Sequence, residues 1–336
     1  MSSKMGKLRF GVVGTGKITA NVIAGARQDE RFEVTAVYSR TLERAKEFAQ
    51  ENDIPHVFDS LEEMASSDLV DVVYIASPNY MHCEQSILCM NCGKHVLCEK
   101  PLASNASEVR KMVEAAKRNG VAFMEAMIST LNPNFVKMRE NLSLAGPLRR
   151  YFAGYCQYSS RYDKFKEGIV LNAFKRELSN GAVMDIGIYT IYPMVALFGR
   201  PQSVAAQGFL LSTGVDAQGS VNFKYDGMDA SVVYSKVADS YLQTEISGEK
   251  GSLVLDKIHI AESLDFVTRT ERRSMGAPLE YDPYYYEIRH FIDLVEAGKT
   301  QSEVNSWDVS LATIEIIDEI RSQLGVRYPA DEVCSE

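Results

Sequence analysis

No stretch of the sequence holds about 18 consecutive apolar residues, so we expect no transmembrane helix. Residues 1–9 lack the apolar core of a secretory signal and lead directly into an expected strand. We therefore expect a cytoplasmic protein. Basic residues are in deficit, with 36 Lys and Arg against 45 Asp and Glu and a net charge of −9. This balance argues against nucleic acid or an anionic membrane surface as the main partner.

Pairs of metal-ligating residues are also scarce. The six cysteines stand at positions 83, 89, 92, 98, 156 and 334. Cys89 and Cys92 have the spacing of a redox or zinc half-site. A second pair and a nearby histidine couple are both missing, and the surrounding segment is typical of a helix. We expect reduced thiols and no metal site.

The composition is that of an ordinary globular protein, with 46% hydrophobic and 24% charged residues, and a length of 336 residues suggests two domains. Between residues 8 and 124, apolar strand-like segments alternate with amphipathic helices. This alternation predicts an α/β fold with a doubly wound parallel sheet, a Rossmann domain, over residues 1–125. The expected strands are 8–13, 32–38, 56–58, 70–76, 94–98 and 121–124.

From residue 126 onward, strand-like segments alternate polar and apolar side chains, and helices no longer separate them one by one. We predict an α+β domain over residues 126–336 with a large, mostly antiparallel open sheet for substrate binding and dimerisation. The expected strands are 151–158, 203–211, 220–225, 229–235, 242–247, 251–255 and 257–261. An open sheet face needs covering, so we expect a homodimer, or a tetramer, formed through it.

A glycine pattern, G-x-x-G-x-G, follows the first expected strand and comprises Gly11, Gly14 and Gly16. An alanine-rich helix begins directly after it, at about residue 19. Glycines let the backbone turn tightly beside a pyrophosphate, and the free N–H groups of the helix start bind phosphate. The strand, turn and helix together predict a dinucleotide site.

The second expected strand ends in Ser39 and Arg40, where NAD-binding proteins usually place an acidic residue against the ribose hydroxyls. A small hydroxyl followed by a guanidinium suits a 2′-phosphate instead. The sequence therefore favours NADP(H), with NAD(H) possible. The alternative is that Arg40 and Arg44 are simply exposed at the start of the next helix.

The fifth expected strand ends in Glu99-Lys100-Pro101. A lysine held before a proline at a strand end is a candidate catalytic residue. The alternative is that the same residues form a solvent-exposed turn with an ion pair between Glu99 and Lys100. Further along, Asp185 and Tyr189 lie four residues apart in a helix expected to run to Phe198, so they share one face. Taken separately, Asp185 could be a helix cap and Tyr189 a core residue. With Lys100 they supply a carboxylate, a phenol and an amine that can exchange protons.

The glycine turn, the Glu-Lys-Pro motif and an Asp-x-Gly helix some eighty residues later resemble the glucose–fructose oxidoreductase / inositol dehydrogenase / rhizopine catabolism family, Gfo/Idh/MocA. The segments 44–49, 124–126 and 184–189 are similar to its dimeric dihydrodiol dehydrogenase and D-xylose 1-dehydrogenase branch. Tyr189, where most of the family has His, supports that branch. Ile128 and Thr130 depart from it, since the branch usually carries a Trp and an Arg there.

The resemblance implies hydride transfer between nicotinamide C4 and a substrate carbinol carbon. Lys100 would bind the reacting oxygen, Tyr189 would donate or accept the proton, and Asp185 would orient Lys100 and the substrate hydroxyls. The implied cofactor-binding residues are Gly14, Thr15, Gly16, Lys17 and Ile18 for the pyrophosphate, Ser39 and Arg40 for the 2′-phosphate, and Ser77, Asn79, Glu99 and Lys100 for the nicotinamide half. His82 is open between a cofactor-facing role and helix packing.

The implied substrate is a sugar, a polyol or a cyclic vicinal diol. Two other functions stay open on the sequence alone. One is a non-catalytic sensor of NAD(P) on the same fold. The other is a reductase of another carbonyl class, with a biliverdin-like or ketosugar substrate.

Overall fold

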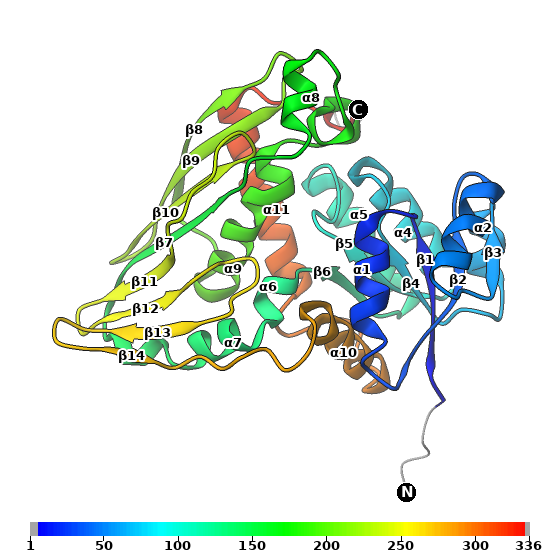
Figure 1. The fold of residues 1–336 in the computed structure, drawn as a ribbon, viewed down its shortest axis with the longest axis horizontal. Coiled ribbons are helices and arrows are strands. Elements are labelled where there is room, and N and C mark those ends of the chain that lie inside the picture. Colours follow the sequence, from blue (N-terminus) through cyan, green and yellow to red (C-terminus); the bar gives the residue numbers. More distant parts are fainter. Residues whose placement is uncertain (1–5, 333–336) are drawn as a thin grey trace, which may run out of the picture. The chain divides into compact units, whose positions relative to one another are not determined.

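A computed structural model describes residues 6–332 of the chain, which divide into two compact units (Figure 1). The first unit comprises Met1–Ala103, Ser107–Ala126 and Glu280–Trp307; the second comprises Ser104–Ala106, Met127–Leu279 and Asp308–Glu336. Residues 1–5, which begin the expected N-terminal polar tail, and Cys334 lie outside the described residues.

The first unit is built on six parallel strands in the order β3-β2-β1-β4-β5-β6. This order confirms the predicted Rossmann arrangement. The strands are β1 (Leu8–Val13), β2 (Phe32–Tyr38), β3 (His56–Phe58), β4 (Val72–Ile75), β5 (His95–Glu99) and β6 (Phe123–Ala126); the helices are α1 (Lys17–Ala26), α2 (Leu42–Glu51), α3 (Leu61–Ser66), α4 (His82–Asn91), α5 (Ala106–Asn119) and the short η1 (Asn79–Met81). Because all six strands are parallel, their carboxyl ends meet at one edge of the sheet.

A late helix, α10 (Pro283–Glu296), also belongs to the first unit, where it packs on α1. Gln28 accepts the Asp282 N–H at 2.9 Å, and Arg31 pairs with Asp293 and Glu296 at 2.7 Å each. A Cβ at Gly25 would lie 2.5 Å from Asp282 Oδ1, so glycine permits this close approach. The proposed domain division at residues 125 and 126 does not include this return of the chain.

The second unit holds an eight-stranded sheet in the order β14-β13-β12-β11-β7-β10-β9-β8. Only β7 and β10 pair in parallel, so the predicted mostly antiparallel sheet is confirmed. The strands are β7 (Leu148–Cys156), β8 (Ser203–Leu210), β9 (Asp216–Lys224), β10 (Asp229–Ser235), β11 (Thr244–Gly248), β12 (Ser252–Leu255), β13 (Leu264–Val267) and β14 (Arg272–Ser274).

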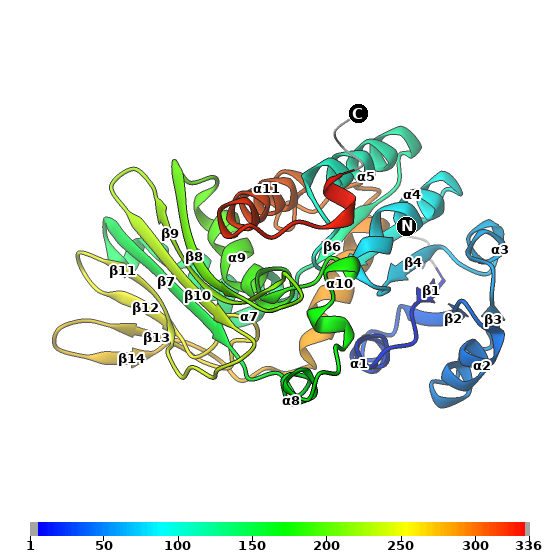
Figure 2. The ribbon, with the colours of Figure 1, turned by 90° about the horizontal axis from the view of Figure 1, so that it is seen from above.

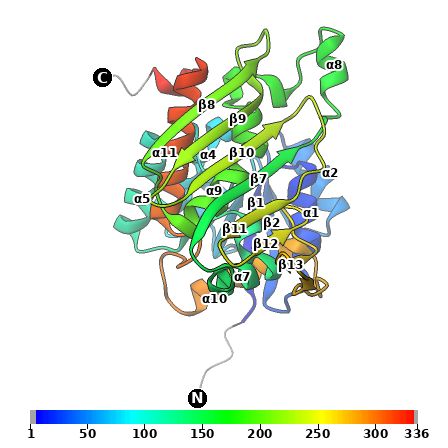
Figure 3. The ribbon, with the colours of Figure 1, turned by 90° about the vertical axis from the view of Figure 1, so that its left-hand side faces the viewer.

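Helices cover one face of this sheet and leave the other bare (Figures 2 and 3). On the covered face lie α9 (Ile188–Phe198) and α11 (Trp307–Leu324). The remaining helical segments are α6 (Ile128–Leu131), α7 (Pro133–Glu140), η2 (Leu142–Ala145), α8 (Tyr162–Lys166), η3 (Asn172–Phe174), η4 (Arg176–Leu178), η5 (Val183–Gly187) and η6 (Pro329–Asp331).

The segment Arg176–Phe198, which ends in α9, is long and apolar enough to cross a membrane by composition alone. However, 72% of its most apolar window is buried inside the protein. The core of the second unit accounts for this apolar character: Tyr151 of β7 donates its hydroxyl proton to the Thr190 carbonyl at 2.9 Å, which joins the sheet to α9.

The expected strand 257–261 is wrong. The Asp256 carboxylate accepts the N–H groups of Glu262 at 2.9 Å and Ser263 at 3.0 Å, which closes a turn over this segment. Ile258 and Ala261 are buried although the backbone bends, so the alternation reflects packing rather than a strand. The chain forms β13 and β14 after this turn instead.

Candidate active site

The glycine turn leads from β1 into α1 in the first unit. Gly14 has a φ of +102°, and a Cβ there would lie 2.5 Å from the Ala76 carbonyl oxygen, so only glycine fits. Gly16 precedes Lys17, the first residue of α1. The N–H groups at this helix start are not needed for intrahelical hydrogen bonds and are available to a phosphate. The residues present therefore fit a dinucleotide pyrophosphate.

Arg44 in the first turn of α2 reaches the same glycine turn. Its guanidinium donates to the Thr15 hydroxyl and to the Thr15 carbonyl, at 3.3 Å in each case, while it also pairs with Glu47 at 3.3 Å. Ser39 and Arg40 lie between β2 and α2. The sequence left open that Arg40 and Arg44 are simply exposed at the start of the helix. Both are exposed, and the contact of Arg44 with Thr15 makes Arg44 a candidate phosphate ligand beside Arg40.

Glu99 and Lys100 stand at the carboxyl end of β5. Glu99 is 9% exposed, and its carboxylate accepts the Tyr74 hydroxyl proton at 2.6 Å and the Lys100 N–H at 3.3 Å. The Lys100–Pro101 peptide bond is cis. Tyr74 belongs to the neighbouring strand β4, so one strand end fixes the side chain of the next. The sequence did not identify Tyr74 as a site residue, because Tyr74 lies within an apolar strand segment and looks like an ordinary core residue.

His82 is buried and bridges two backbone segments. Its ring nitrogens lie 2.9 Å from the Pro101 carbonyl oxygen and 2.8 Å from the Ser77 carbonyl oxygen. Burial lowers the pKa of His82, although both carbonyl contacts oppose that shift. A neutral ring carries one N–H, so it donates to one carbonyl at a time. The Ser77 hydroxyl donates to the side-chain oxygen of Gln85 at 2.6 Å. His82 and Ser77 therefore both stabilise the backbone at the ends of the neighbouring strands.

In the second unit, Asp185 lies in η5, a turn wider than an α-helical one, directly before α9. Such turns are frequent at functional sites. Asp216 fixes the start of this turn by accepting the N–H groups of Ala182 at 3.1 Å and Val183 at 2.7 Å. The Asp185 carboxylate forms an ion pair with the ammonium of Lys236, a buried residue just after β10.

Tyr189 in α9 lies against two aromatic rings of the same unit. Tyr155 of β7 stands edge-on to Tyr189, with ring centroids 5.6 Å apart, and His259 stacks flat on Tyr155 at 4.1 Å. Burial, and then the charge of Asp185, raise the pKa of Tyr155 to about 12, and burial lowers the pKa of His259 to about 4. His259 reaches this position because the segment 257–261 bends. The sequence did not identify either ring as part of the site, because Tyr155 lies in a strand and His259 lies in a segment that was expected to be a strand.

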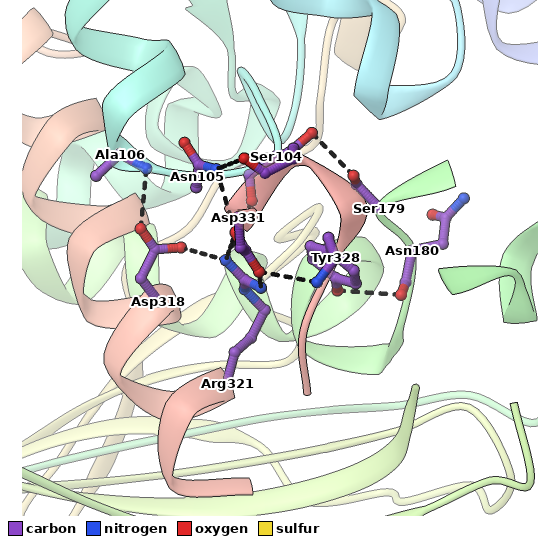
Figure 4. Close-up of polar contacts among 10 residues, drawn as sticks. Ser104, Asn105, Ala106, Ser179, Asn180, Asp318, Arg321, Tyr328 and Asp331 are labelled. Atoms are coloured by element: carbon purple, nitrogen blue, oxygen red, sulfur yellow. Dashed lines mark hydrogen bonds and ion pairs between the residues drawn. The ribbon is translucent and has the colours of Figure 1, made fainter. Parts of the chain in front are cut away.

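A buried network around Arg321 anchors the segments that lead to these residues (Figure 4). Its guanidinium pairs with Asp318 at 2.6 Å and with Asp331 at 2.8 Å, and it donates to the Ser104 carbonyl at 3.3 Å. The Ser179 hydroxyl donates to the Ser104 hydroxyl at 2.8 Å. Ser104 follows Lys100 by four residues and Ser179 precedes Asp185 by six. Within the second unit, one network thus joins the segment at Ser104 to the segment at Ser179.

Comparison with known proteins decides the family. Residues 8–127 match the oxidoreductase family with an NAD-binding Rossmann fold, and residues 155–254 match the GFO/IDH/MocA C-terminal domain. A scyllo-inositol 2-dehydrogenase (NADP(+)) of Bacillus subtilis is 49% identical over 326 residues, which cover 97% of this chain and 99% of that protein.

The chain belongs to the Gfo/Idh/MocA oxidoreductase family. A trans-1,2-dihydrobenzene-1,2-diol dehydrogenase of Xenopus laevis is 31% identical over 334 residues, covering 96% of this chain and 99% of that protein. Aldose-aldose oxidoreductase from Caulobacter crescentus shares the fold, with a TM-score of 0.84 at 20% identity over 95% of this chain and 98% of its own. The predicted family and branch are confirmed, and so is the class of enzyme, an NAD(P)-dependent oxidoreductase acting on CH–OH groups.

Ile128 and Thr130, the two residues at which the sequence was expected to depart from the dihydrodiol branch, both lie buried in α6. The Thr130 hydroxyl donates to the Met127 carbonyl at 3.0 Å. Among residues 6–332, no group of three or more His, Cys, Asp or Glu side chains is placed to hold a metal ion. The five cysteines in that range form no disulfide.

Glu99, Glu125 and Glu287 are three of the buried acids in the first unit of this oxidoreductase. Glu125 accepts the Leu102 N–H at 3.2 Å, and Glu99 accepts Tyr74 as described. Glu287 of α10 is 1% exposed, and its Oε2 has no hydrogen-bond partner among the described residues. Burial, followed by the charges of Glu99 and Glu125, raises the pKa of Glu287 well above its usual range. Among these three acids, the surroundings of Glu287 therefore favour its protonated form.

We expect Glu287→Gln to stabilise the protein increasingly as the pH rises from 5 to 8. Above the pKa of an unfolded glutamate, the unfolded chain loses this proton while the folded chain keeps it, so wild-type stability falls with pH. Gln cannot ionise and escapes that loss, which amounts to at most about 1.4 kcal/mol per pH unit in this window. Thermal unfolding at several pH values measures the difference. Glu114→Gln, at an exposed site on α5, is the matched control, and a pH-independent effect of Glu287→Gln would contradict the assignment.

Proposed function

We propose that this enzyme moves a hydride between nicotinamide C4 of NADP(H) and a carbinol carbon of a sugar, polyol or cyclic vicinal diol. The observation that carries the proposal is the 49% identity to the scyllo-inositol 2-dehydrogenase of Bacillus subtilis over 97% of the chain. The side chains of the second unit agree with such a substrate. The Asp185 carboxylate accepts hydrogen bonds and the Tyr189 phenol can donate one, as neighbouring hydroxyls require.

The preference for NADP(H) is supported by three side chains and one absence. Ser39, Arg40 and Arg44 follow the end of β2 in the chain, and no carboxylate stands directly after that strand. Two guanidiniums in this place suit the charge of a 2′-phosphate. We assign the pyrophosphate to Gly14, Thr15, Gly16, Lys17 and Ile18, and the nicotinamide half to Ser77, Asn79, His82, Glu99 and Lys100.

For the chemistry, we assign Lys100 to bind the reacting oxygen and stabilise negative charge on it. The cofactor supplies the hydride acceptor when bound. Tyr74, Glu99 and His82 hold the strand ends around Lys100 and so define its position. Tyr189 is the second group able to take or return the hydroxyl proton, and Asp185 orients the substrate hydroxyls.

The stacked pair of Tyr155 and His259 supports a cyclic substrate. Aromatic faces pack well against the C–H faces of sugar and cyclitol rings, since they bury apolar area without competing for the hydroxyl groups. Both rings lie next to Tyr189. Substrate rings would thus meet a flat wall on one side and the polar pair of Asp185 and Tyr189 nearby.

A panel of inositols, aldoses and cyclic diols assayed with NADP+ tests this function by NADPH formation. We expect turnover of at least one polyhydroxylated ring, with scyllo-inositol the first compound to try. If every polyhydroxylated compound fails while acids, imines or isolated ketones are turned over, the proposed substrate class is overturned.

We also propose that the enzyme is a homodimer, or a tetramer, joined through the bare face of the eight-stranded sheet. This face carries a hollow of about 480 Å³ lined by Gly208, Phe209, Gly219 and Val233, among others, and Phe209 is 52% exposed. The residues that line this hollow are uncharged, so covering it by self-association needs no charge to be desolvated there. Ser220→Arg at its centre should give monomers in light scattering, whereas Glu62→Arg on α3 should not; an unchanged mass for Ser220→Arg contradicts this interface.

A further inference from the structure

Lys236 carries a buried ammonium close to the proposed substrate side chains. Its side chain is 4% exposed and forms an ion pair with Asp185 Oδ2, while its Nζ lies 5.5 Å from the centre of the Phe174 ring. The backbone is held as well, since the Lys236 N–H donates to the Ala217 carbonyl at 2.9 Å. Nothing in the sequence marked this lysine, which follows the strand segment 229–235.

A charge buried to this degree needs a partner, because removing an unpaired ammonium from water costs several kcal/mol. Asp185 supplies that partner and is itself 33% exposed, so part of the pair is accessible from solvent. Lys236 extends from the rigid end of β10, whereas Asp185 sits in the widened turn η5. The sheet therefore fixes the position of a carboxylate that belongs to a less regular turn.

The other titratable groups around the pair either carry no charge or are already committed. Asp216 is fully buried and caps the same turn; burial raises the pKa of Asp216 to about 6, and Lys236 opposes that shift. Tyr155, on which the charge of Asp185 acts, and His259, which stacks on Tyr155, have pKa values displaced toward the neutral forms. The ammonium of Lys236 is thus the positive charge that faces Asp185 from the sheet.

We propose that Lys236 is a positioning residue that fixes the Asp185 carboxylate, so that Asp185 serves as a permanent hydrogen-bond acceptor for a substrate hydroxyl. This inference rests on the proposed function, since it assigns a role at the same site. It leaves proton transfer to Lys100 and Tyr189, because a carboxylate held by a buried ammonium is a poor proton acceptor. It also makes Lys236 a determinant of specificity for substrates with a hydroxyl beside the reacting carbon.

The test compares Lys236→Met, which keeps the length but not the charge, with Lys236→Arg, which keeps the charge. With the best substrate of the wild-type enzyme, Lys236→Met should lower kcat/KM by about 10- to 100-fold, chiefly through the KM for substrate, while the KM for NADP+ changes less than twofold. Removing the ammonium favours protonation of Asp185, so the acidic limb of the kcat/KM profile should move to higher pH. Lys236→Arg should keep the wild-type limb.

A substrate-independent measurement separates this inference from the proposed function. In a double-mutant cycle of Lys236→Met and Asp185→Asn, thermal unfolding at pH 7.5 should show a favourable coupling of several °C that shrinks progressively as the pH falls below about 5, where Asp185 begins to be protonated. No coupling, or a loss of activity for Lys236→Met that is the same at every pH, overturns the positioning role. The double variant also covers the case in which Lys236→Met alone does not fold. Failure of the substrate panel would instead refute the substrate class.

Discussion

Lys100→Ala should lose at least about 1000-fold in kcat while NADP+ still binds within about fivefold of the wild-type affinity. A group that stabilises charge on the reacting oxygen and assists its proton contributes about 100- to 10,000-fold to catalysis. The glycine turn and the arginines at the end of β2 remain in this variant, so most of the cofactor contacts proposed here persist. Steady-state kinetics and titration of NADP+ by thermal shift measure the two quantities separately.

Lys111→Ala, an exposed lysine on α5, is the matched control for this experiment and should behave like the wild-type enzyme. Retention of more than a tenth of the wild-type kcat by Lys100→Ala would remove Lys100 from the catalytic assignment. If kcat and NADP+ affinity fall together by similar factors, Lys100 acts in cofactor binding rather than on the substrate oxygen.

The double substitution Arg40→Ala with Arg44→Ala should weaken NADP+ binding by about 100-fold and change NAD+ binding less than threefold. Each hydrogen bond to a charged group contributes about 1.5 kcal/mol, so two lost contacts to a 2′-phosphate correspond to about that factor. NAD+ lacks this phosphate and is unaffected by its ligands. Thermal shifts with both cofactors at fixed ionic strength give the comparison.

NAD+ is the internal control here, and Lys137→Ala on α7 controls for loss of a positive charge elsewhere. An equal loss of affinity for both cofactors would mean that the arginines support the fold of the glycine turn. A larger thermal shift of the wild-type protein with NAD+ than with NADP+ would overturn the proposed preference.

The sequence predicted the fold well wherever the signal is local. The apolar segments of the first unit and the residues between them led to the correct strand positions, because a strand buried on both faces must be apolar throughout. Alternation of polar and apolar residues, the signal used for the second unit, failed at 257–261, where it came from two buried side chains on a bent backbone. There the Asp256 carboxylate accepts two backbone N–H groups and stabilises a turn, so this segment does not form a strand.

Around the candidate site, motifs identified the residues and geometry supplied their partners. Glu99, Lys100, Asp185 and Tyr189 could be named from the sequence because each stands in a motif or at a helical spacing. Lys236 could not, since its pairing with Asp185 joins residues 51 positions apart. Glu287 likewise reads as an ordinary helix residue until α10 is found packed in the first unit.

By itself, the sequence determined the Rossmann domain, from alternating strands and helices around the glycine turn, and the open, mostly antiparallel sheet, from polar and apolar alternation after residue 126; the resemblance of its motifs to a known family indicated a dinucleotide-dependent oxidoreductase. Only the tertiary structure decided that Asp185 is held by Lys236, that Arg44 reaches Thr15, and that burial near Glu99 and Glu125 raises the pKa of Glu287. The physical reason is that backbone periodicity and turn formation depend on residues close together in the sequence. Ion pairing and desolvation depend instead on which residues, distant in the sequence, are buried next to one another.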